Sequence, residues 1–160
     1  MFSITIICIG KLKDKFFEDA SAEYLKRLSG YANVKIIEIK AETLQSEPND
    51  SQISAVLEKE AEAIIKKIPS DSVVIPMCIE GKQLSSEDLA DYFDNKLISG
   101  KSSFCFIIGG SYGLHDKVKN YGALKLSMSK MTFPHRLARI MLLEQIYRAC
   151  KINAGENYHK

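Results

Sequence analysis

The sequence predicts an α/β protein with a mainly parallel sheet and helices on both faces. Short, continuous apolar runs alternate with segments of helical periodicity along the whole chain. Such runs are typical of parallel strands that are buried on both faces. The chain of 160 residues suits one domain, and no shift in composition marks a boundary, so we treat residues 1–160 as a single domain.

The first half of the chain gives two pairs of a strand followed by a helix. The run Phe2–Ile9 lacks a preceding basic segment and a cleavage site, so it predicts a strand rather than a signal peptide. Helical spacing of apolar residues predicts a helix over Phe16–Leu28, and Val34–Ile39 predicts a second strand. A second helical pattern covers Ile53–Ile68. Because no apolar run is long enough to cross a bilayer, we expect a cytoplasmic protein without a membrane partner.

The second half of the chain continues the alternation. Apolar runs predict three further strands: Ser72–Cys78, Ser103–Ile108 and Ala123–Ser127. Ser85 and Asp88 have the spacing of a capping box, which predicts a helix from this point to Ile98, before Gly100.

The last helix is predicted to begin at Pro134, which suits the first helical position, and to reach about Asn153. Its apolar residues cover too much of its circumference for one core face: Leu137, Ile140, Met141, Leu142, Leu143, Ile146, Tyr147 and Cys150. A helix that is apolar on nearly every side is buried on several sides. We therefore expect a second subunit to cover part of it, in a homodimer.

Charge and cysteine content exclude some classes of function. The net charge of +2 does not by itself indicate a nucleic-acid binder, although basic residues cluster in two places. These clusters are Lys11, Lys13 and Lys15, and Lys130, Arg136 and Arg139. The four cysteines lie in separate apolar runs and the three histidines are scattered, which favours buried thiols and predicts no metal site.

Two loops rich in glycine or serine leave the ends of two predicted strands. The first, Gly109–Leu114, follows the fourth strand, and the second, Met128–His135, follows the fifth. Crevices at the carboxyl ends of parallel strands hold small ligands, and glycine lets a backbone approach a ligand closely. The glycine spacing matches neither a dinucleotide-binding fingerprint nor a phosphate-binding P-loop. The residues therefore predict a small-ligand crevice of another kind.

Several motifs together resemble those of a known family. They are Ile9–Lys13, Glu80–Lys82 with Leu84–Ser86, the glycine loop, Lys130–His135 and Tyr158–Lys160. With these motifs, which run from end to end, the chain resembles the RlmH family of ribosomal RNA large subunit methyltransferases, in the SPOUT class. The resemblance implies an α/β fold with a C-terminal trefoil knot. It also implies S-adenosylmethionine as the cofactor, in a crevice lined by Met77, Gly109, Met128, Ser129, Lys130, Met131, Thr132 and Phe133.

The reaction that the resemblance implies is methylation of N3 of a pseudouridine in helix 69 of 23S ribosomal RNA, on the assembled 70S ribosome. N3 carries a proton that must leave before the nitrogen attacks, so a base or a stabilising cation is expected nearby. The candidates are His135, Arg136, Tyr158 and His159, of which we expect His135, Tyr158 and His159 to be catalytic. We expect Lys11, Lys13, Arg136 and Arg139 to bind RNA.

Three alternatives stay open at this stage. The chain could be a SPOUT methyltransferase with another RNA target, or a ribosome-associated binding factor without catalysis. The last residues, Gly155–Lys160, could be a frayed end, as most termini are. The tail nevertheless ends in an aromatic ring, an imidazole and an ammonium group, and we expect Tyr158 and His159 to reach an active site, that of the neighbouring subunit being one possibility.

Overall fold

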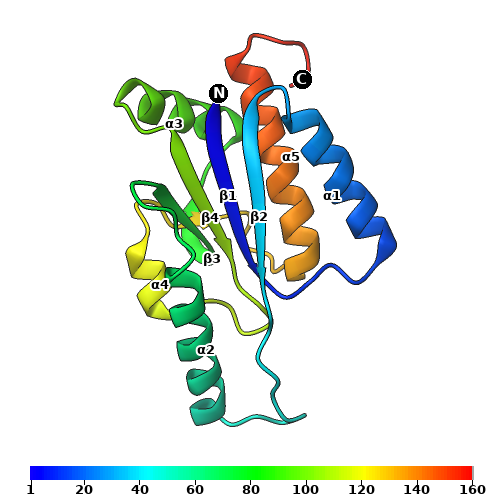
Figure 1. Ribbon diagram of the computed structural model, residues 1–160, viewed down its shortest axis with the longest axis vertical. Coiled ribbons are helices and arrows are strands. Elements are labelled where there is room, and N and C mark those ends of the chain that lie inside the picture. Colours follow the sequence, from blue (N-terminus) through cyan, green and yellow to red (C-terminus); the bar gives the residue numbers. More distant parts are fainter. Residues whose placement is uncertain (160) are drawn as a thin grey trace.

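The computed structural model describes residues 1–159 and has a five-stranded, fully parallel sheet with helices on both faces (Figure 1). The strand order is β2-β1-β4-β3-β5. The elements in chain order are β1 Phe2–Ile9, α1 Lys15–Leu28, β2 Ala32–Ile39, α2 Asp50–Ile65, β3 Val73–Gln83, α3 Ser86–Ile98, β4 Ser103–Ile108, α4 Asp116–Tyr121, β5 Leu126–Ser127 and α5 His135–Asn153. The predicted fold class is thus confirmed.

The two faces of the sheet carry separate cores. On one face, alternate residues of β1 and β4 pack against α1, α3 and α5, with Phe93, Phe104 and Leu142 fully buried. On the other face, Ile7 and Ile107 pack against α2 and α4. A strand between two apolar layers has no polar face, which is the physical reason for the continuous apolar runs in the sequence.

The fifth predicted strand is shorter than expected. The pattern predicted Ala123–Ser127, whereas β5 contains only Leu126 and Ser127. Gly122 packs so closely on Pro76 that a Cβ atom there would lie 2.2 Å from the proline ring. The segment leading to β5 is therefore fixed by this contact and by a hydrogen bond from Ala123 N to Val74 O (2.9 Å) rather than by a regular ladder.

The third strand bends around β5. Leu126 pairs with Met77 on one side of an irregularity and with Lys82 on the other, so the residues between them bow out of the ladder. Gly81 makes this possible, because a Cβ atom there would lie 2.8 Å from the carbonyl of Lys125. The bow brings the middle of β3 to the loops that follow β4 and β5. The trefoil knot implied by the resemblance stays a prediction.

The last helix has neighbours within its own chain on several sides. α5 lies on the sheet and packs between α1 and α3. Its residues Leu142, Leu143 and Ile146 are fully buried, whereas Ile140 and Met141 are half-buried. Four of the eight apolar residues that suggested a second subunit are therefore buried within one chain and the other four are half-buried, so the homodimer stays a prediction.

Candidate functional site

A cavity of about 760 Å³ lies at the carboxyl edge of the sheet. α5 begins at this end of the sheet (Figure 1). The walls of the cavity come from β3, from the loops after β4 and β5, and from the first turn of α5. The lining residues are Met77, Cys78, Ile79, Ile108, Gly109, Gly110, Ser111, Gly113, Leu126, Ser127, Met128, Ser129, Met131, Thr132, Phe133, Pro134, His135 and Ala138. Loops separated in sequence thus form one concave surface, as is usual at this edge of a parallel sheet.

The loop after β4 turns back on itself. Gly113 N donates to Gly110 O at 3.1 Å, and Gly113 has φ +81°, a conformation that favours glycine. A Cβ atom on Gly109 would lie 2.4 Å from the carbonyl oxygen of Gly113. Gly109 is therefore needed for the loop to close, and its contact with the cofactor stays a prediction.

The loop after β5 is held by two serines. Ser127 Oγ donates to Ser129 O at 3.0 Å, and Ser129 Oγ accepts from Met131 N at 3.0 Å. Of the residues expected to bind the cofactor, the structure brings Met77, Gly109, Met128, Ser129, Met131, Thr132 and Phe133 to the cavity wall. Lys130 is exposed and does not line the cavity.

His135 is half-buried in the cavity wall at the start of α5. Burial, and after it the charges of Arg136 and Arg139, lower the pKa of His135 below its usual 6.5. The imidazole is therefore neutral at physiological pH and has a nitrogen that can accept a proton. Among residues 1–159, His135 and Cys78 are the only titratable side chains that line the cavity.

Arg139 occupies a different environment from the one expected. It is 2% exposed, its Nη1 donates to Glu38 Oε2 at 2.8 Å, and its Nη2 donates to Gly10 O at 3.1 Å. A side chain held this way inside the protein does not contact a phosphate, so the expectation that Arg139 binds RNA is wrong. Its guanidinium instead ties the loop after β1 to α5.

The other basic residues expected to bind RNA lie at or near the surface. Lys11 and Lys13 are exposed on the loop that follows β1. Arg136 is partly exposed, and its Nη1 lies 3.8 Å from Asp14 Oδ2 on the same loop. The ion pair thus joins the first turn of α5 to the loop that carries Lys11 and Lys13.

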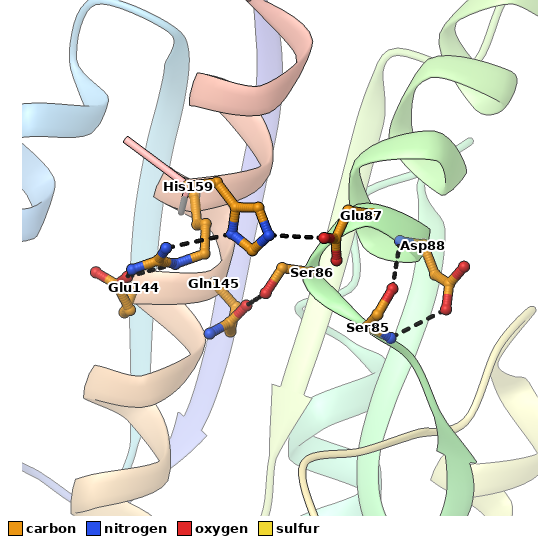
Figure 2. Close-up of polar contacts among 8 residues, drawn as sticks. Ser85, Ser86, Glu87, Asp88, Glu144, Gln145 and His159 are labelled. Carbon is orange, nitrogen blue, oxygen red and sulfur yellow. Dashed lines mark hydrogen bonds and ion pairs between the residues drawn. The ribbon is translucent and has the colours of Figure 1, made fainter. Parts of the chain in front are cut away.

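The C-terminal tail is docked on its own chain as far as His159; Lys160 lies outside the described residues. Tyr158 OH donates to Glu144 Oε2 at 3.0 Å, and the guanidinium of Arg148 lies over the Tyr158 ring at 4.6 Å. His159 Nε2 lies 2.7 Å from Glu87 Oε1, and its Nδ1 lies 3.3 Å from Arg148 Nη1 (Figure 2). The tail is thus bound through both ring nitrogens of His159, not frayed.

The tail lies beside a second, smaller cavity of about 480 Å³ between α1, α3 and α5. Glu144 lines it, and Ser86 Oγ bonds Gln145 Oε1 across it at 2.5 Å (Figure 2). Tyr158 and His159 line neither cavity. Within one chain, the three expected catalytic residues therefore separate into His135 in the larger cavity and the two tail residues elsewhere.

Sequence reasoning missed the partners that hold the tail. Glu87, Glu144 and Arg148 are ordinary helix-surface residues by pattern, and Arg148 also forms an i,i+4 ion pair with Glu144 at 2.7 Å. The i,i+4 spacing of Glu144 and Arg148 on one predicted helix could have indicated their pairing, whereas nothing in the pattern points to Glu87. Leu126 and Ser127, which line both cavities, were assigned only to a strand.

The polar chemistry of the larger cavity comes mainly from the backbone. Glycine and serine loops offer N–H and C=O groups, and methionine and phenylalanine side chains form apolar walls. Among residues 1–159, no group of three or more His, Cys, Asp or Glu side chains is arranged to hold a metal ion. In the same part of the chain, no helix has both the length and the apolar character needed to span a membrane. The lining of the larger cavity, with backbone polar groups and apolar side chains, suits a small organic ligand with polar ends and an apolar body.

Comparison with known proteins assigns the family. The family model described as "Predicted SPOUT methyltransferase" matches residues 2–159. Two curated relatives named "Putative ribosomal RNA large subunit methyltransferase H", from Methanococcus vannielii and Methanococcus maripaludis, are each 51% identical over 158 residues, which is 99% of this chain and 99% of each relative. The chain belongs to the RlmH family of SPOUT methyltransferases.

Among solved structures, a probable methylase family protein from Haemophilus influenzae Rd KW20 has a similar fold. It aligns with a TM-score of 0.53 and 14% sequence identity, covering 98% of this chain and 70% of the other. At this identity the match supports the α/β fold alone. Family membership thus comes from the sequence comparisons, and it confirms the resemblance seen in the motifs.

Proposed function

We propose that this RlmH-family chain uses S-adenosylmethionine to methylate N3 of a pseudouridine in helix 69 of 23S ribosomal RNA, on the assembled 70S ribosome in the cytoplasm. The observation that carries the proposal is the larger cavity. Seven residues assigned to the cofactor from motif resemblance line it together, in a chain that is 51% identical to relatives named as ribosomal RNA methyltransferases.

The lining residues fit this cofactor in size and chemistry. A cavity of about 760 Å³ lies within the range of roughly 300–1,000 Å³ that is usual for small-molecule sites. Backbone groups of the loops after β4 and β5 can pair with the adenine and amino-acid ends, while Met77 and Phe133 offer apolar walls. When bound, the cofactor supplies an electrophilic methyl group. The protein must then position the acceptor nitrogen and receive its proton.

His135 is the group in the cavity wall best suited to receive that proton. Its lowered pKa keeps the imidazole neutral, and its place in the first turn of α5 puts it beside Arg136, whose charge can stabilise an anionic base ring. Cys78 is a weaker candidate, because burial is the first cause of its raised pKa and the thiol therefore stays protonated.

We further propose that the enzyme is a homodimer in which the tail of one protomer completes the site of the other. The position of the docked tail supports this, because Tyr158 and His159 line no part of the larger cavity in their own chain. The smaller cavity between α1, α3 and α5 also supports this proposal. Half-buried Ile140 and Met141 line that cavity and can be covered by a second copy of the chain.

One pair of experiments tests the proposed function. Ribosomes from cells with and without this gene are compared by mass mapping of helix 69, and the purified protein is incubated with the undermethylated ribosomes and radiolabelled S-adenosylmethionine. We expect a methyl group at one pseudouridine in the first experiment and transfer of label in the second. Label at another nucleotide would favour a different RNA target, and ribosome binding without transfer would favour a binding factor.

A further inference from the structure

Phe16 is an aromatic side chain that the fold leaves in solvent. It lies in the first turn of α1 and is 66% exposed, although its ring contacts that of Phe17 with the centroids 4.4 Å apart. Lys11, Lys13 and Lys15 precede it along the same short segment. A single exposed apolar residue is common, but an exposed ring within a run of lysines has the composition of a nucleic-acid contact.

The segment that carries these side chains is fixed in place. Gly10 N donates to Ile39 O at 2.7 Å, and the buried Arg139 donates to Gly10 O at 3.1 Å. Leu12 N donates to Glu38 Oε2 at 3.4 Å, the same carboxylate oxygen that Arg139 binds. Because β2 and α5 hold the loop on two sides, little conformational entropy is lost when its side chains bind a partner.

The charges on this segment are available to a phosphate. Lys15 pairs with Asp19 at 3.1 Å, whereas Lys11 and Lys13 form no ion pair among residues 1–159. The segment also starts at the cavity, since a Cβ atom on Gly10 would lie 3.7 Å from His135 Cε1. An RNA strand that enters the site can therefore pass this loop.

We propose that Phe16 is a stacking site for an unpaired base of the RNA substrate, with Lys11 and Lys13 contacting the flanking phosphates. The proposal rests on the proposed function for the presence of an RNA substrate. An aromatic ring can stack on any base that is not already stacked in a helix, and loops of structured RNA provide such bases. A second copy of this chain is the competing occupant of the same surface.

Phe16→Trp provides a direct test, because the chain contains no tryptophan and the new side chain is the only indole reporter. We expect its fluorescence to be quenched when a single-stranded uridine dodecamer is added at low salt. Tyr121→Trp is the matched control, since Tyr121 is 53% exposed on α4, which lies on the other face of the sheet. No quenching of the indole at position 16, or quenching equal to the control, would overturn the proposal. A change on raising protein concentration without RNA would overturn it in favour of self-association.

Ribosome binding by co-sedimentation separates stacking from simple apolar contact. Phe16→Ala and Phe16→Leu should each weaken binding roughly 5- to 100-fold, whereas Phe16→Tyr should keep it, because only an aromatic ring stacks. Calorimetry with S-adenosylmethionine should give the same affinity for all three variants, which shows that the fold is intact. If Phe16→Leu binds ribosomes as tightly as the wild type does, the stacking site is disproved. If the wild type binds ribosomes through Phe16 but transfers no methyl group, the proposed function fails and the stacking site stands.

Discussion

The cavity at the carboxyl edge of the sheet and the docked C-terminal tail are built from opposite kinds of residues. The cavity has apolar walls and backbone polar groups, with His135 and Cys78 as its titratable side chains. The tail region joins Glu87, Glu144, Arg148 and His159 through charged hydrogen bonds and ion pairs. The first region suits the binding of a cofactor, and the second holds groups that can move or stabilise charge.

This difference shows how a small enzyme can separate the residues that bind a ligand from the residues that carry charge. A cavity that is mostly apolar can exclude water and fix a ligand, but it offers few groups for proton transfer. Besides His135, the groups that could serve that purpose lie in the tail region, outside the larger cavity. If both regions take part in one reaction, they must meet across two chains or after the tail moves.

Removal of the tail is the change with the largest expected effect. Truncation after Asn157 should lower the methylation rate by about 10²–10⁴-fold, the contribution of a positioned acid or base. Cofactor affinity, measured by calorimetry, should stay unchanged because no tail residue lines the larger cavity. Mixing the truncated chain with a chain carrying His135→Ala should restore activity if the tail acts between protomers. Full activity of the truncated enzyme on ribosomes would show that the tail has only a structural role.

Gly109→Ala tests the cavity from the other side. The added Cβ would meet the carbonyl of Gly113 at 2.4 Å, so the loop must shift, at a cost of about 1–3 kcal/mol. Cofactor affinity in calorimetry should fall roughly tenfold or more, because the loop forms the cavity wall. Gly30→Ala is the matched control, since a Cβ there meets nothing within 4 Å and affinity should not change. Equal affinities in both variants would mean that the loop does not bind the cofactor.

Arg139→Met tests the buried link between α5 and the loop after β1. The variant leaves Glu38 and Gly10 O without their donor, and we expect the free energy of unfolding in urea to fall by about 2 kcal/mol. The loss is smaller than for a fully buried pair because the Glu38 side chain is 34% exposed and can be hydrated. Arg27→Met, which breaks an exposed ion pair with Glu23, should leave the free energy of unfolding in urea unchanged. An equal fall in the free energy of unfolding of Arg27→Met would contradict the prediction that the buried pair stabilises the fold more than the exposed pair.

The smallest expected effect is a pH dependence that comes from His135. Because its pKa in the folded state is lowered, the unfolded chain binds more protons at this residue as the pH falls below its usual 6.5. The stability that depends on neutral His135 is therefore complete above that pH and is lost on acidification. Urea unfolding from about pH 7.5 to about pH 5.5 should show a smaller loss for His135→Gln than for the wild type. Parallel curves for the two proteins would contradict this assignment.

The fold was largely predictable because its signals are local. The capping box of α3 is present, with Ser85 and Asp88 each bonded to the other's backbone N–H at 3.0 Å. The α4 helix was missed because six residues are too few to show a helical period. The Ala123–Ser127 prediction was too long because hydrogen-bonding partners, not apolar pattern, decide where a short strand ends.

The candidate site was predictable only in part, for a related reason. Loops rich in glycine and serine can be recognised from composition, so the sequence and the motifs predicted a ligand crevice where the larger cavity lies. The contact of His159 with Glu87 joins residues 72 positions apart, and no local sequence pattern predicts it. Arg139 looked like a surface residue because its partner Glu38 lies 101 positions earlier. Charged side chains that become buried through distant partners are the class that a pattern assigns wrongly.

The bonds of Arg139 also bear on the order in which the molecule is assembled. This side chain in α5 closes contacts with residues 101 and 129 positions earlier, and the pairing of β1 with β4 also joins residues 100 positions apart. Contacts of such long range carry a large cost in loop-closure entropy, which slows folding. Because His135 lies in the first turn of α5, the cavity wall that contains it exists only once α5 is in place. Cofactor binding in a refolding experiment therefore reports the docking of α5 rather than collapse of the chain.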